Sequence, residues 1–125
     1  MKTNPQLEKL ERTWRTERKA AQLASHEANR LTAEAQHLGD LAPAELHAQA
    51  AASHDAASEA YRQAAGAARA YNEAAIGEYN AALATGDPSA RHKAAYRVRP
   101  DAEARHLQEA AEHEKWAEHH RGAGA

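Results

Sequence analysis

Histidine is the residue type whose number and spacing could do chemistry in this sequence. Nine of the 125 residues are histidine, and none is cysteine. Two rows repeat at intervals of seven residues, which places the members of each row on one face of a helix. The first row is His47, His54 and Tyr61, and the second is His106, His113 and His120. Imidazoles bind transition metals and titrate near pH 6.5, so the rows indicate either metal binding or a response to acid.

A metal site needs ligands three or four residues apart or on different helices, because seven residues span about 10.5 Å of helix. Glu109 lies three residues after His106 and four before His113. In an antiparallel bundle, His26, His54 and His119 or His120 would come to similar heights. A divalent transition metal is therefore the alternative to a chain without a cofactor. The candidate ligands are His26, His54, His106, Glu109, His113 and His120.

Two other roles for the histidines stay open. They could lie on the surface, or they could be buried and hydrogen-bonded across helices. Protonation of all nine would move the formal charge from -2 to about +7. If the rows sit between helices, that change would loosen the bundle or its oligomer.

Sequence motifs that are typical of enzymes are absent. There is no cysteine nucleophile, no glycine-rich phosphate loop, and no H-E-x-x-H or G-x-S-x-G motif. Residues 25–27 and 53–55 each place a serine, a histidine and an acidic residue side by side. Adjacent positions on a helix point about 100° apart, so neither triplet is a catalytic triad. We expect a non-enzymatic protein without catalytic residues.

Local signals divide the chain into helices. Asn4 is a good N-cap, and Pro5 suits a first helical position. Gly39 is typical of a residue that follows a helix, and Pro43 can open the next one. The sequence Gly-Asp-Pro at 86–88 repeats the pattern of a helix end followed by a new start.

These signals predict an all-α fold, an antiparallel up-down-up bundle of three long helices. The helices cover about 5–38, 43–85 and 88–120. The last is kinked or broken near Pro100, which lacks an N–H and restricts the residue before it. Four helices, with 88–98 as a separate short helix, are the alternative. The turns are short, so neighbouring helices must be antiparallel.

Large apolar side chains are scarce: the chain has nine Leu, one Ile, one Val and no Phe. Burying a methyl group contributes about 0.8 kcal/mol, against about 1.5–3 kcal/mol for a leucine. We therefore expect further burial through self-association or a protein partner. A heptad seam along the first helix, broken once at Glu17, predicts a coiled-coil-like contact. We also expect Gly66 and Gly77 to mark close helix crossings, with a bend in the helix as the alternative. The predicted core or interface residues are Leu7, Leu10, Trp14, Leu31, Leu38, Tyr61, Tyr71, Tyr79 and Trp116.

Two segments rich in Lys and Arg should meet at one end of the bundle. Residues 1–20 carry six basic residues against three Glu, and residues 88–105 carry five against two acidic residues. Such an end could bind nucleic acid, because cations release the counterions of a phosphate backbone. Ion pairs on a solvated helix face are the alternative. The candidate nucleic-acid ligands are Lys9, Arg12, Arg15, Arg91, Lys93, Arg97 and Arg99.

The sequence predicts a single helical-bundle domain over 1–121 and a disordered tail at 122–125. No apolar run approaches the ~20 residues that span a bilayer, and the first residues do not resemble a signal peptide. We expect a cytoplasmic, bacterial, non-enzymatic scaffolding or adaptor protein that acts through self-association or a protein partner. A nucleic-acid-associated accessory protein and a His/Glu metal-binding bundle are the alternative functions.

Overall fold

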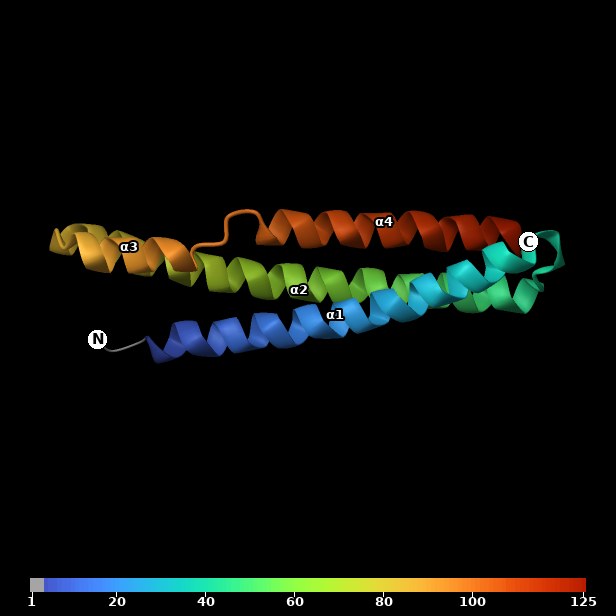
Figure 1. The fold of residues 1–125 in the computed structure, drawn as a ribbon, viewed down its shortest axis with the longest axis horizontal. Coiled ribbons are helices and arrows are strands. Elements are labelled where there is room, and N and C mark those ends of the chain that lie inside the picture. The colour runs from blue at the N-terminus through green and yellow to red at the C-terminus, as the bar shows by residue number, and fades with distance from the viewer. Residues whose placement is uncertain (1–3) are drawn as a thin grey trace.

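A computed structural model describes residues 4–125, and this part of the chain forms only helices and the turns between them. Helix α1 (Pro5–Leu38) leads through a short 3-10 turn (Gly39–Leu41) into α2 (Ala44–Thr85), and α3 (Pro88–Arg97) and α4 (Ala102–Ala123) follow. Figure 1 shows a rod in which α1, α3 and α4 lie along α2. The predicted all-α, up-down-up bundle is confirmed.

The predicted turn residues end and begin the helices. The Asn4 side chain accepts hydrogen bonds from the N–H groups of Gln6 and Leu7, at 3.0 and 3.4 Å. Gly39 and Gly86 adopt φ angles of 56° and 73°, which glycine reaches without the strain that a Cβ would cause. Local chemistry therefore sets the lengths of α1 and α2.

The third helix is broken between α3 and α4, near Pro100 as predicted. A proline cannot donate a backbone hydrogen bond and disfavours a helical residue before it. The N–H of Arg99 donates to the Asn72 side chain of α2 instead, at 2.7 Å. Helix α4 continues to Ala123, so residues 122–123 are helical where the sequence predicted a disordered tail.

Helix α2 is the central helix, because α1 and α4 pack along it and α3 packs against its C-terminal part. Its buried face is made mainly of alanines, which let the neighbouring helices approach closely. The largest apolar cluster, Leu7, Trp14 and Tyr71 with two alanines, lies toward the N-terminal end of α1. The rings of Trp14 and Tyr71 stack there with centroids 5.3 Å apart.

The predicted core residues lie in three environments. Leu7, Trp14, Leu31, Tyr61 and Tyr71 are buried. Leu10 and Tyr79 are half-buried. Leu38 and Trp116 are 37% and 38% exposed, so they add little to the core, and their role in an interface stays a prediction.

The two glycines inside α2 do not mark close helix crossings. Gly66 and Gly77 are exposed, and a Cβ built on either would meet nothing within 4 Å. Helix α2 continues through both positions. The predicted crossings are wrong, because α1 and α4 pack on the alanine and tyrosine face of α2 instead.

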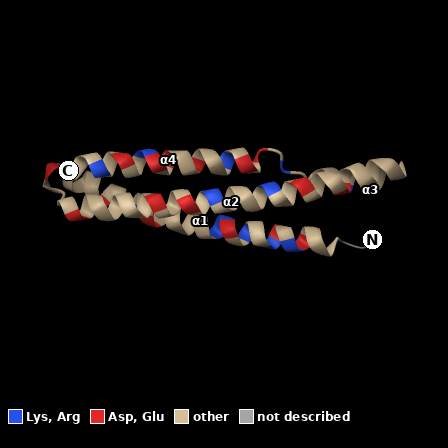
Figure 2. Cartoon of the chain, turned by 180° about the vertical axis from the view of Figure 1, so that it is seen from behind, with Lys and Arg blue, Asp and Glu red and all other residues tan. Residues whose placement is uncertain are grey.

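The basic segments lie toward the same end of the bundle, as antiparallel packing requires. The first half of α1 and the α3–α4 junction are found at this end in Figures 1 and 2. Lys2 lies outside the described residues. None of the helices in residues 4–125 is long and apolar enough to cross a membrane.

Candidate functional site

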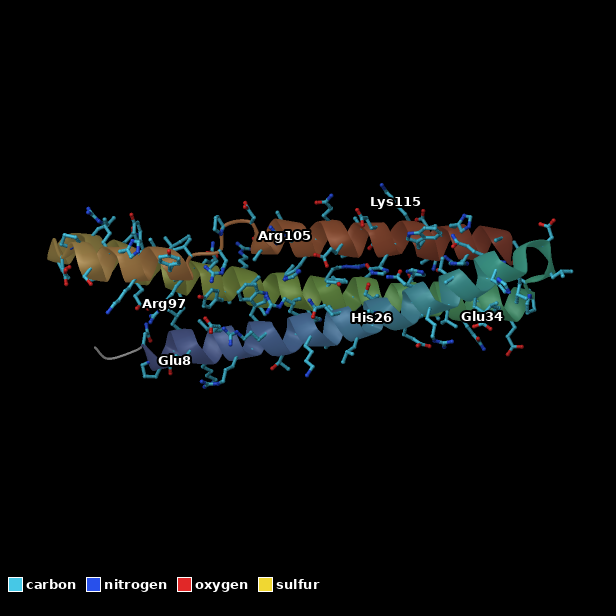
Figure 3. The ribbon with its side chains drawn as sticks, viewed as in Figure 1. Glu8, His26, Glu34, Arg97, Arg105 and Lys115 are labelled. Carbon is cyan, nitrogen blue, oxygen red and sulfur yellow. The ribbon has the colours of Figure 1, made fainter. Side chains whose placement is uncertain are left out.

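The two histidine rows face each other where α2 packs on α4. The helices run antiparallel, so each step of seven residues along α2 matches a step of seven back along α4. His47 pairs with His120 and His54 with His113, with Nδ1 atoms 2.9 and 2.7 Å apart. Tyr61 faces His106, with ring centroids 6.0 Å apart. Figure 3 shows nitrogen-bearing side chains along this contact.

Helix α1 contributes two hydroxyl groups that bond to the imidazoles. Thr32 Oγ1 lies 2.6 Å from His54 Nε2 and 2.8 Å from His120 Nε2. Ser25 Oγ lies 3.0 Å from His113 Nε2. We call the connected series the histidine column. In hydrogen-bond order it consists of His47, His120, Thr32, His54, His113 and Ser25.

The column satisfies all its hydrogen bonds when its histidines are neutral. A neutral imidazole donates from one nitrogen and accepts at the other, and a hydroxyl also does both. The donors can therefore all point from His47 toward Ser25, or all in the reverse direction. One proton added to a neutral imidazole pair leaves the N–H···N hydrogen bond between the two rings intact. A second added proton would place two N–H groups face to face and break the pair.

Burial favours the neutral state. His54 is 0% exposed and His120 is 1% exposed. Burial, together with the charges of His113 and His120, lowers the pKa of His54 to about 4 against the opposing effect of Asp55. Burial also lowers the pKa values of His113 and His120. The charged forms lose hydration that no nearby carboxylate fully replaces.

His106 lies one heptad beyond the column and has a different partner. The indole Nε1 of Trp14 donates to His106 Nε2 at 3.1 Å. An indole N–H can only donate, so the proton of the neutral His106 ring is on Nδ1. In the described part of the chain this buried Nδ1 has no hydrogen-bond partner, and the nearest carboxylate oxygen, Glu109 Oε1, is 3.8 Å away. Burial lowers the pKa of His106.

The predicted metal ligands are only partly brought together. His54, His113 and His120 lie in the column, while His106 and Glu109 lie one heptad away and His26 is exposed on α1. Nitrogens 2.7–2.9 Å apart are at hydrogen-bonding distance. Across residues 4–125, no group of three or more His, Asp or Glu side chains is arranged to hold a metal ion. Metal binding by these residues stays a prediction.

Ser25 and Thr32 were not predicted as site residues, and His47 was recognised only as a member of its row. A signal was present, because Ser25 and Thr32 are separated by the same seven residues as the histidines. Helices α1 and α4 run parallel, so Ser25 lies opposite His113 and Thr32, seven residues later, lies opposite His120. Predicting the contact requires the rotation of α1 about its axis, which alanine spacing defines poorly.

The candidate nucleic-acid ligands lie on α1, on α3 and in the linker to α4. Two of them form ion pairs: Arg15 with Glu11 at 2.9 Å and Arg97 with Glu78 at 2.8 Å. The exposed members are Lys9, Arg12, Arg15, Arg91, Lys93 and Arg99. Nucleic-acid binding by this end of the bundle stays a prediction.

Comparisons with known proteins identify no relative. The chain matches no protein family, and no curated protein or solved structure is significantly similar to it.

Proposed function

We propose that this chain is a non-enzymatic helical interaction protein that self-associates through the end formed by α2 and α3. The observation that supports this function is apolar exposure where the bundle is two helices thick. Leu7, near the start of α1, packs in the cluster of Ala75, so the final turns of α2 extend beyond α1. Ile76, Leu83 and Tyr96 are 41%, 45% and 69% exposed.

The α2–α3 end buries little apolar surface of its own. Among the residues of α3, only Ala94 is buried. A two-helix hairpin held by alanines needs further burial, because each methyl group contributes only about 0.8 kcal/mol. A second copy could cover Ile76 and Leu83 with the same surface of its own chain, in a two-fold symmetric interface.

Light scattering after size exclusion tests self-association. We expect the wild-type chain to form a dimer and Leu83→Asn to be a monomer. Leu107→Asn is the matched control, since Leu107 on α4 is 47% exposed and Leu83 is 45% exposed. A wild-type monomer, or equal loss of the dimer in both variants, would refute this proposal.

A second candidate function is a response to acid, which the histidine column favours. The column joins α1, α2 and α4 through side chains, while the backbones of α1 and α4 make few contacts within residues 4–125. Protonation of both imidazoles in a pair would break that link. We expect the free energy of unfolding of the bundle to fall between pH 7.5 and pH 4.5, and unchanged stability at both pH values would contradict this function.

A further inference from the structure

We propose that the cleft at the start of α4 binds a phosphate group. The cleft has a volume of about 480 Å³ and lies between α1, α2 and the α3–α4 linker. It is separate from the histidine column and from the exposed apolar end. Its lining includes Arg18, Arg99 and Arg105 together with His106.

Within the described part of the chain, the three cleft arginines have no carboxylate partner. Six of the eleven arginines form ion pairs with carboxylates within residues 4–125, and five do not. Three of those five, Arg18, Arg99 and Arg105, line this cleft. Guanidinium groups pair with phosphate oxygens through two parallel hydrogen bonds. Uncompensated arginines are therefore concentrated where an anion would meet them.

The three arginines come from separate segments of the chain. Arg18 is on α1, and its guanidinium carbon lies 5.2 Å from the centroid of the Trp14 ring, which helps to orient it. Arg99 is in the linker and donates to the carbonyl oxygens of Tyr96 and Val98. Arg105 is near the start of α4 (Figure 3). Donors from three separate segments suit a ligand with several acceptor oxygens, such as phosphate.

Two further features of the cleft favour an anion. His106 is 5% exposed, and its buried Nδ1–H finds no acceptor among residues 4–125. Asp101, at the N-terminus of α4, makes no capping hydrogen bond through its side chain. The N–H of Ala102 donates to the carbonyl oxygen of Arg99 at 3.3 Å, but the next N–H groups, of Glu103 and Ala104, have no side-chain cap. They and the positive end of the helix dipole are therefore available to a ligand.

Two carboxylates, Asp101 and Glu109, also line the cleft and reduce its charge to a net +1 with the three arginines. Glu109 Oε1 lies 3.8 Å from His106 Nδ1, on the side of the unsatisfied donor. A phosphate oxygen would take the place of this carboxylate opposite the donor. Neutralising Glu109 should therefore strengthen binding, whereas a cleft that binds a cation would show the opposite effect.

Titration calorimetry on the full chain tests the site with inorganic phosphate, glycerol 3-phosphate and acetate at equal ionic strength. We expect both phosphates to bind and acetate not to bind. Arg18→Gln and Arg105→Gln should each weaken binding by about tenfold or more, because each removes charge-assisted hydrogen bonds. Glu109→Gln should tighten binding. Far-UV circular dichroism checks that each variant remains helical.

Arg12→Gln is the matched control, since Arg12 is an arginine of α1 that pairs with no carboxylate within residues 4–125 and lies outside the cleft. It should leave the affinity unchanged. Tighter binding of glycerol 3-phosphate would assign the site to a phosphate monoester, and equal binding would assign it to free phosphate. The site is refuted if neither phosphate binds, or if Arg12→Gln weakens binding as much as Arg105→Gln.

Discussion

Acidification should destabilise the bundle, and protonation of His54 should make the largest contribution to the loss of stability. This ring is completely buried between α1 and α4, and its pKa is lowered from an ordinary value of 6.5 to about 4. His113 and His120 face it from α4, and Asp55 is its acidic neighbour on α2. The folded state therefore resists a proton that the unfolded chain accepts readily.

The sign and size of the effect follow from this difference. Above pH 6.5 the ring is neutral in both states, and its full contribution to stability is present. Between pH 6.5 and pH 4 the unfolded state binds more protons, so the free energy of unfolding falls as the pH falls. A difference of about 2.5 pKa units corresponds to a loss of about 3 kcal/mol. Below pH 4 this contribution changes no further.

A loss of that size matters for this chain. Small domains are typically stable by about 5–15 kcal/mol, and an alanine-rich core favours the low end of that range. His106, His113 and His120 have lowered pKa values for the same main reason, burial, and act in the same direction. We expect much of the total stability to be lost by pH 4.

Urea unfolding followed by circular dichroism at several pH values between 7.5 and 4 measures this slope. His54→Gln should be less stable at pH 7.5 and should lose less stability on acidification than the wild type. His26→Gln removes an exposed histidine outside the column and should keep the wild-type slope. The reasoning fails if wild-type stability is flat from pH 6.5 to pH 4, or if His54→Gln keeps the full slope.

Two further predictions concern stability at neutral pH. Gly66→Ala and Gly77→Ala should each raise the free energy of unfolding by about 0.5–1 kcal/mol, because both glycines are exposed inside a helix with room for a Cβ; urea midpoints measure this, and a loss would indicate a contact with a partner. Thr32→Val should cost about 2–4 kcal/mol, because two buried imidazole nitrogens lose their partner. Thr13→Val, at an exposed position of α1, is its control. Equal losses in the two variants would show that the hydrogen bonds of Thr32 to the column do not stabilise the fold.

Helix boundaries could be predicted from the sequence because they depend on local chemistry. The Asn4 cap, the glycines at 39 and 86 and the break near Pro100 each act within a few residues. The roles of Gly66 and Gly77 could not be predicted in this way. A glycine in an alanine-rich helix is equally compatible with a close crossing and with an exposed face, and only the packing of α1 and α4 distinguishes them.

The histidine column could be predicted in part. The seven-residue rows correctly place the imidazoles on one face of α2 and one face of α4. Their pairing depends on the register between the helices, since His54 meets His113 only if α4 starts opposite the correct turn of α2. The break at 98–101 sets that register, and the distance that this linker spans along α2 cannot be read from the sequence. The links through Ser25 and Thr32 also require the rotation of α1.

The column gives a physical reason for burying polar residues in a core that has few large apolar side chains. Alanine seams let helices slide, because one methyl group packs much like another. Directional imidazole pairs oppose sliding: if α4 moved by one heptad, His47 would meet His113 and His120 would have no partner on α2. A buried polar residue fixes register in coiled coils at a cost in stability, and the column would act in the same way. The residues that select the register are then the ones that acid charges, so specificity and acid sensitivity have the same origin.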